Sequence, residues 1–193
     1  MKHTLVPAQE WTRRSFLGLG AAAVGAALLP APAYATADEV AQKPSRVLSF
    51  FNIHTNERLT AAYWSAGVYK PEALERINTL LRDYRANEIK AIDKSLLDLL
   101  HELHAALGVE QPFHVISGYR SPQTNAMLRA RGGKDSGVAS GSLHMEGKAI
   151  DIRVPGIDLD ELRRAARALK RGGVGYYPSS NFVHVDTGRV RFW

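Results

Sequence analysis

The chain has 193 residues, a formal net charge of +6, 45% hydrophobic residues, 23% charged residues and no cysteine. These values are ordinary for one soluble globular domain, and they exclude a disulfide framework and any metal site built on thiolates. Lysines and arginines form no stripe with interleaved aromatics, so nucleic acid is not an expected partner.

Residues 1–37 are predicted to be an export signal. "TRRSFLG" places Arg13 and Arg14 ahead of an apolar run at 19–29, and "APAYATA" supplies small residues for cleavage. The arginine pair resembles a twin-arginine signal, which predicts a periplasmic or other extracytoplasmic location. The alternative is an uncleaved membrane anchor, but the run is shorter than the roughly 20 residues that span a bilayer. Cleavage would remove a net +2, leaving a mature domain of +4 with no stable membrane span.

After a flexible, polar lead-in at 38–45, residues 46–193 are predicted to form one domain. Two strand-like stretches around "TN" predict a hairpin over 46–64. Apolar residues at helical spacing predict helices over 70–85 and 93–107, the second capped by Asp93 and stopped by Gly108. The remaining expected elements are a strand at 113–118, a short helix after Ser121, a Gly/Ser-rich loop at 132–141, a strand at 148–154, a helix at 158–171, and strands at 173–177 and 181–188.

This order of elements predicts the α+β class. Helices come early and strands cluster late, which is typical of a small antiparallel sheet flanked by helices. No pattern in the chain indicates an oligomeric state.

The late strands carry the candidate chemistry. In "NFVHVDTG" the alternation of a strand puts the two valines on one face and His184 on the other. In "KAIDIRV" the isoleucines share a face and Asp151 lies opposite, so antiparallel pairing would make Asp151 and His184 neighbours. His144, in "SLHMEG", can fold over that face. Two imidazoles and a carboxylate, with a fourth position for water, are typical of a catalytic zinc site. The alternative is a hydrogen-bonded core histidine, with the aspartate capping a turn or pairing with an arginine.

Three motifs, "SGYRSPQTN", "SLHMEGKAID" and "GGVGYYPSSNFVHVDTG", together resemble the MepK-type (YcbK-like) murein endopeptidases. These belong to the D-alanyl-D-alanine metallopeptidase, lysostaphin and hedgehog superfamily. The likeness extends through "NIHTNE", "LRDYR" and "RFW". It implies that Zn²⁺ is bound by His144, Asp151 and His184, and that Arg120 holds the scissile carbonyl and its developing oxyanion. It also implies peptidoglycan stem peptides as the binding partner. Without this resemblance, Arg120 would be interpreted as a surface arginine or as the partner of an acidic residue.

The sequence departs from the family at the general base. Many relatives carry an acidic residue three positions before the last ligand, or a histidine two positions before it, where this chain has Asn181 and Phe182. Asp186 shares a strand face with His184 and is expected either to act as the base or to orient the His184 ring. Further candidates near the site are Glu146, His54 and Glu57. Substrate contacts or pocket walls are expected from Tyr119, Gln123, Ser142 and Tyr177.

The expected function is an exported zinc endopeptidase that hydrolyses peptidoglycan cross-links involving D-alanine or diaminopimelate. One rival is a DD- or LD-carboxypeptidase that trims stem peptides. Another is a non-catalytic wall-binding module, which the missing acidic residue at position 181 favours.

Overall fold

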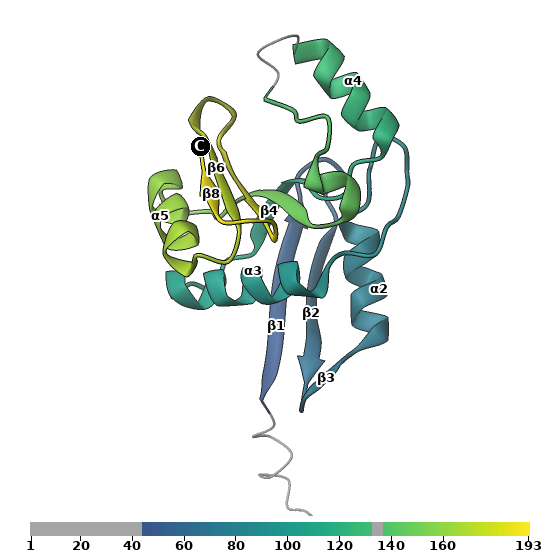
Figure 1. Cartoon of the computed structure of the whole chain (residues 1–193). Coiled ribbons are helices and arrows are strands. Elements are labelled where there is room, and N and C mark those ends of the chain that lie inside the picture. The colour runs from purple at the N-terminus through teal and green to yellow at the C-terminus, as the bar shows by residue number, and fades with distance from the viewer. Residues whose placement is uncertain (1–43, 133–136) are drawn as a thin grey trace, which may run out of the picture. The chain divides into compact units, whose positions relative to one another are not determined.

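The computed structural model describes residues 44–132 and 137–193, so the predicted signal at 1–37 and most of the lead-in lie outside the described residues. Within the described chain, four α-helices accompany an eight-stranded sheet (Figure 1), which confirms the α+β class. The elements are β1 (Ser45–Asn52), β2 (Arg58–Ser65), β3 (Val68–Tyr69), α2 (Pro71–Leu80), α3 (Lys94–Leu107), β4 (Phe113–Ser117), α4 (Pro122–Gly132), η2 (Leu143–Glu146), β5 (Ala149–Arg153), α5 (Leu159–Leu169), β6 (Gly173–Tyr177), η3 (Pro178–Ser180), β7 (Phe182–Asp186) and β8 (Arg191–Phe192).

The sheet is mixed, with the strand order β3-β2-β1-β4-β5-β7-β6-β8. Most neighbours are antiparallel, but β1 pairs with β4 and β6 pairs with β8 in parallel. The prediction of an antiparallel sheet thus holds for most strand pairs and differs from the structure at these two. Between β1 and β4 the chain passes through α2 and α3, a connection long enough to return the chain for parallel pairing. Strands β3 and β8 were not predicted, because two residues are too few to show an alternating pattern.

Local signals placed most of the other elements correctly. The β1–β2 hairpin turns through Asn56, which has a positive φ of 59°. Asparagine adopts this left-handed conformation more readily than most residues do. Helix α3 begins after Asp93, whose side chain accepts from the Ser95 backbone N–H, and ends at Gly108 with a φ of 63°. Both caps are those that the sequence predicts.

Helix α2 is shorter than the predicted range of 70–85, since it ends at Leu80. The buried Asp83 carboxylate accepts hydrogen bonds from the backbone N–H groups of Arg85, at 3.0 Å, and of Ser121, at 2.8 Å. Such side-chain-to-backbone hydrogen bonds compete with helical ones and favour turns. Asp83 thus holds the turn that follows the helix and ties this turn to the segment that carries Arg120.

The two faces of the central strands have different characters. On one face the sheet residues join the apolar side chains of the helices in a single core. Its fully buried members include Leu48, Phe50, Leu96, Leu97, Leu100, Phe113, Ile150, Ile152, Val183 and Val185. On the other face of β5 and β7 lie polar groups that are also buried, and these form the candidate site. Among the described residues, no helix is long and apolar enough to cross a membrane.

Candidate metal centre

The register of β5 and β7 brings two of the predicted ligands together. The strands pair antiparallel, with Asp151 directly opposite His184. Ile150 opposes Val185 and Ile152 opposes Val183, so the apolar partners face the core while Asp151 and His184 share the other face. The predicted strand pairing and the shared face are therefore confirmed.

His144 reaches the same face from the short helix η2, which ends at Gly147. Gly147 has a φ of 69°, and a Cβ atom at this position would lie 2.5 Å from the backbone oxygen of Ala91. Only glycine combines this backbone conformation with so close an approach. The tight turn lets η2 pack beside β5 and places His144, which is 1% exposed, over the strands.

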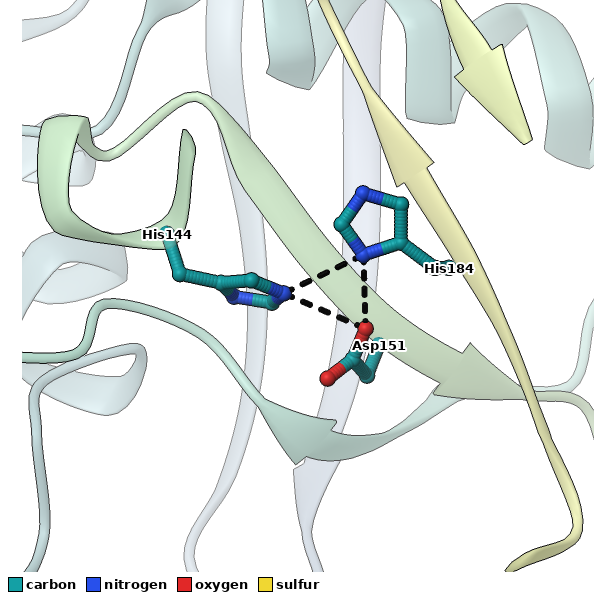
Figure 2. A group of neighbouring side chains, drawn as sticks. All are labelled: His144, Asp151 and His184. Atoms are coloured by element: carbon teal, nitrogen blue, oxygen red, sulfur yellow. Dashed lines mark hydrogen bonds and ion pairs between the residues drawn. The ribbon is translucent and has the colours of Figure 1, made fainter. Parts of the chain in front are cut away.

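Three donor atoms converge at one point (Figure 2). His144 Nε2 lies 3.2 Å from Asp151 Oδ1 and 3.2 Å from His184 Nδ1, and His184 Nδ1 lies 2.9 Å from Asp151 Oδ1. In the part of the chain that the structure describes, these residues form the one group of histidines and acidic residues arranged so that it could hold a metal ion.

The outer nitrogens of both imidazoles are already engaged, which determines where their protons lie. His144 Nδ1 is 2.7 Å from the carbonyl oxygen of Gly118, and His184 Nε2 is 2.9 Å from Asp186 Oδ2. Both partners can only accept, so these two nitrogens donate. In the neutral rings, His144 Nε2 and His184 Nδ1 then direct lone pairs at each other and at a carboxylate oxygen. Three buried acceptors in mutual contact need a cation between them, or a proton in its place.

Electrostatic surroundings keep Asp151 charged. Burial opposes ionisation, but His144, His184 and Arg120 together hold the pKa of Asp151 well below its usual range. Burial, with a contribution from Arg120, lowers the pKa of His144. Burial also acts against protonation of His184, yet its hydrogen bonds with Asp151 and Asp186 raise its pKa. The centre thus combines a carboxylate that is held ionised with one imidazole, His144, that is held neutral.

Arg120 lies at the centre and contacts a predicted ligand directly. Its Nη2 donates to Asp151 Oδ2, and its Nε donates to Ser117 Oγ at 2.8 Å. Its side chain is only 12% exposed. Arg120 is therefore the partner of a buried carboxylate, and it also lines the cavity beside the three donor atoms.

A cavity of about 260 Å³ opens onto the three donors. Of the predicted wall residues, Ser142 and Tyr177 line it, whereas Tyr119 and Gln123 are not among its described lining residues. His54 instead stacks on Tyr84 with ring centres 4.3 Å apart. Two acidic candidates are also engaged elsewhere, since Glu57 pairs with Arg82 and Glu146 with Lys148.

Asp186 does not line the cavity, because it lies behind His184 and is fully buried. Its carboxylate accepts from the backbone N–H groups of Gly173 and Gly188 and from both terminal nitrogens of Arg191. This geometry favours the ring-orienting alternative for Asp186 over the general base.

Sequence reasoning missed Arg191 and Trp193, which also line the cavity. The motif "RFW" contains both residues, but nothing local to it indicates that the chain returns to His184. The Gly118 carbonyl that orients His144 was missed as well, because a backbone group carries no signal in a sequence.

Known proteins resemble this chain over nearly its whole length. A family model described as peptidoglycan L,D-endopeptidase MepK matches residues 40–193. The chain is 48% identical over 181 residues to the peptidoglycan L,D-endopeptidase MepK of Escherichia coli strain K12, covering 94% of this chain and 96% of the relative. It is 41% identical over 185 residues to the probable peptidoglycan L,D-endopeptidase MepK of Haemophilus influenzae, covering 95% and 96%. The chain belongs to the peptidoglycan L,D-endopeptidase MepK family.

Proposed function

We propose that this protein is an exported, zinc-dependent peptidoglycan endopeptidase that hydrolyses peptide cross-links involving diaminopimelate or D-alanine. The observation that carries the proposal is the convergence of His144 Nε2, Asp151 Oδ1 and His184 Nδ1 at the floor of a cavity. Membership of the MepK family supports the substrate class.

The donor set fits zinc. Two imidazole nitrogens and one carboxylate oxygen are ligands that zinc takes in catalytic sites, where a fourth position stays open to water. Atoms about 2.0–2.1 Å from a tetrahedral zinc ion lie about 3.4 Å apart, and small movements from the present 2.9–3.2 Å would provide that spacing. When bound, zinc would polarise the peptide carbonyl and make its water acidic enough to ionise near neutral pH.

The chain's own residues would prepare the substrate. Arg120 lines the cavity beside Asp151, so its guanidinium can hold the scissile carbonyl and stabilise negative charge as it develops on that oxygen. Asp186 keeps the proton on His184 Nε2 and fixes the orientation of the ring. Tyr177 and Phe182, whose rings stack with centres 4.6 Å apart, form an aromatic wall of the cavity for the stem peptide.

Export is the second part of the proposal. The twin-arginine-type signal falls on residues 1–37, outside the described residues, and a peptidoglycan substrate requires a periplasmic or other extracytoplasmic location. A fusion of residues 1–40 to a reporter that is active only after folded export would test it. Replacing Arg13 and Arg14 by lysine should block export of the reporter.

The activity test is a digest of purified muropeptide dimers, with and without a chelator. Dimers joined by an L,D bond between two diaminopimelates and dimers joined by a D,D bond to D-alanine are supplied separately. Monomers that disappear on chelation and return with Zn²⁺ support the endopeptidase. Shortened stem peptides would instead identify a carboxypeptidase, and retained zinc without any product would identify a wall-binding module. Asp151→Asn should be inactive, whereas Glu110→Gln, a change on the exposed loop before β4, should match the wild type.

A further inference from the structure

A pair of side chains near the end of the chain, Arg191 and Trp193, lies behind and beside the candidate metal centre. We call this pair the clamp. It contributes no donor atom to the metal position, and the function proposed above assigns it no task. Both residues are nevertheless held in defined contacts that lead to His184.

Arg191 fixes the carboxylate of Asp186 in one plane. Its Nη1 and Nη2 donate to Oδ1 and Oδ2 at 3.0 and 2.7 Å, a two-pronged contact that specifies orientation as well as charge. The N–H groups of Gly173 and Gly188 donate to the same Oδ1 at 3.1 and 2.9 Å. Oδ2 is thereby aimed at His184 Nε2, 2.9 Å away.

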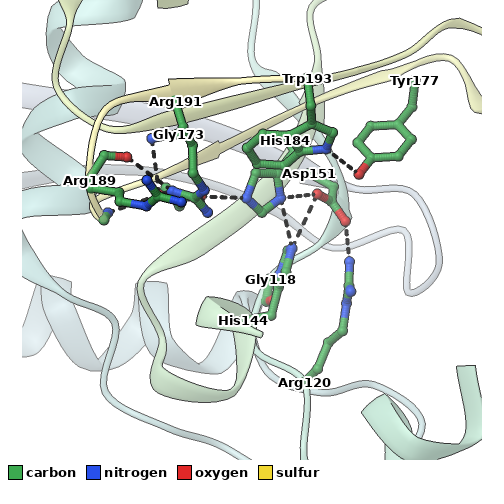
Figure 3. A network of polar contacts seen from close by, with 12 residues as sticks. Gly118, Arg120, His144, Asp151, Gly173, Tyr177, His184, Arg189, Arg191 and Trp193 are labelled. Atoms are coloured by element: carbon green, nitrogen blue, oxygen red, sulfur yellow. Dashed lines mark hydrogen bonds and ion pairs between the residues drawn. The ribbon is translucent and has the colours of Figure 1, made fainter. Parts of the chain in front are cut away.

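The Trp193 ring packs against the His184 ring at a tilt of 48°, with ring centres 5.3 Å apart (Figure 3). The Arg191 guanidinium lies 4.9 Å from the Trp193 ring centre. Trp193 Nε1 donates to the Tyr177 hydroxyl at 2.7 Å. Its backbone is tied to β6, because its N–H donates to the Val174 oxygen at 3.2 Å. The indole is therefore anchored at several points and restricts rotation of the imidazole.

Two glycines of β6 make room for the clamp. A Cβ atom at Gly175 would lie 2.7 Å from Trp193 Cε2, and one at Gly173 would collide with Arg191 Nη1. The glycines in "GGVGYY" thus leave no side chain on the strand where Arg191 and Trp193 cross it. This close approach explains the glycines at positions 173 and 175.

We propose that Arg191 and Trp193 are positioning residues for His184. Arg191 acts through Asp186 to keep the His184 proton on Nε2 and the Nδ1 lone pair at the metal position, and Trp193 holds the ring in that orientation. The inference rests on the proposed function, since it assigns to the clamp part of the affinity of the site for its metal ion. Partners that orient metal-bound histidines typically contribute about 10–100-fold in affinity.

The test measures Zn²⁺ affinity by competition with a chromophoric chelator, using the full chain. Arg191→Gln should bind Zn²⁺ about 10-fold more weakly than the wild type, the lower end of that range, because Asp186 itself remains. The matched control is Arg189→Gln, a change at an exposed arginine two residues away, which should leave the affinity unchanged. Trp193→Phe keeps a ring but loses the donor to Tyr177, and should cause a smaller loss.

A second readout separates positioning from a purely structural role. Long-range proton–nitrogen NMR spectra of the metal-free protein, recorded at a pH high enough for the His184 ring to be neutral, report which of its two nitrogens carries the proton. The wild type and Arg189→Gln should show the Nε2–H form, and Arg191→Gln should show a mixture. If Arg191→Gln does not fold, Arg191→Lys keeps the charge without the two-pronged geometry and should still lose affinity.

The possible results distinguish this inference from the proposed function. A folded Arg191→Gln or Arg191→Lys protein with wild-type Zn²⁺ affinity and an unchanged His184 spectrum would overturn the clamp while leaving the endopeptidase intact. A wild-type protein that retains no Zn²⁺ would overturn both. A wild-type protein that retains Zn²⁺ without cleaving muropeptides, combined with weaker binding by the variant, would overturn the activity alone.

Discussion

Arg120 is expected to serve two purposes, and its replacement should show two separable effects. It lines the cavity, where its guanidinium can stabilise charge on the scissile carbonyl, and it donates to Asp151, a proposed metal ligand. The change to test is Arg120→Ala. The exposed Arg129 near the end of α4 provides a matched control, Arg129→Ala.

The two effects differ in size and in their dependence on zinc. Loss of a donor to a developing oxyanion costs about 10²–10³ in kcat, or about 2.7–4 kcal/mol. Loss of a partner that orients a metal ligand costs about 10–100-fold in metal affinity. With Arg120 in place the Asp151 side chain is only 3% exposed, so the guanidinium rather than bulk water is the partner of its Oδ2. At limiting zinc both effects should lower the rate, whereas at saturating zinc only the loss in kcat should remain.

The assay is cleavage of a muropeptide dimer at increasing Zn²⁺, with the metal affinity measured separately. We expect Arg120→Ala to bind Zn²⁺ more weakly and to plateau at about 10²–10³ below the wild-type rate. Arg120→Lys keeps a charge but not the geometry, and should fall in between. Full activity at saturating zinc would remove Arg120 from the chemistry, and unchanged zinc affinity would show that its contact with Asp151 does not support the ligand.

Three further results are expected. Chelation should lower the melting temperature as well as the activity, because zinc at 100 times its Kd would add about 2.7 kcal/mol to the unfolding free energy; equal melting curves with and without chelator would contradict this. His184→Ala should abolish zinc retention, measured by elemental analysis, and cleavage, whereas His101→Ala in α3 should preserve both. Asp98 is a pH-dependent stabiliser: burial opposes its ionisation, but hydrogen bonds from Arg46 and two tyrosines lower its pKa. The unfolded group titrates at about 3.9, so this stabilisation is complete above that pH and is lost as the pH falls through the lower folded value. Denaturant titrations should therefore show that Asp98→Asn has an unfolding free energy about 1–3 kcal/mol below that of the wild type at pH 7, and that this difference shrinks in acid. A difference that does not change with pH would refute the role of the Asp98 charge.

The predictions that came true rest on short-range patterns. A strand alternates its side chains with a period of two, so the placement of Asp151 and His184 opposite the aliphatic residues follows from six or seven letters of sequence. Helix caps are local in the same way, as Asp93 and Gly108 illustrate. The end of α2 was misplaced because Asp83, which holds the turn after the helix, bonds to Ser121, and that partner is 38 residues away.

The sequence by itself thus determined the α+β class and the faces of the late strands, and it predicted His144, Asp151 and His184 as candidate ligands. Only the tertiary structure decided that β4 runs parallel to β1, that Arg120 contacts Asp151, and that Arg191 and Trp193 support His184. The physical reason is the separation along the chain between the residues that set each feature. Periodicity and capping depend on neighbours along the chain. These contacts depend instead on where a long connection returns the backbone and on which side chains then fit. Gly173 and Gly175, for example, leave the space that Arg191 and Trp193 occupy.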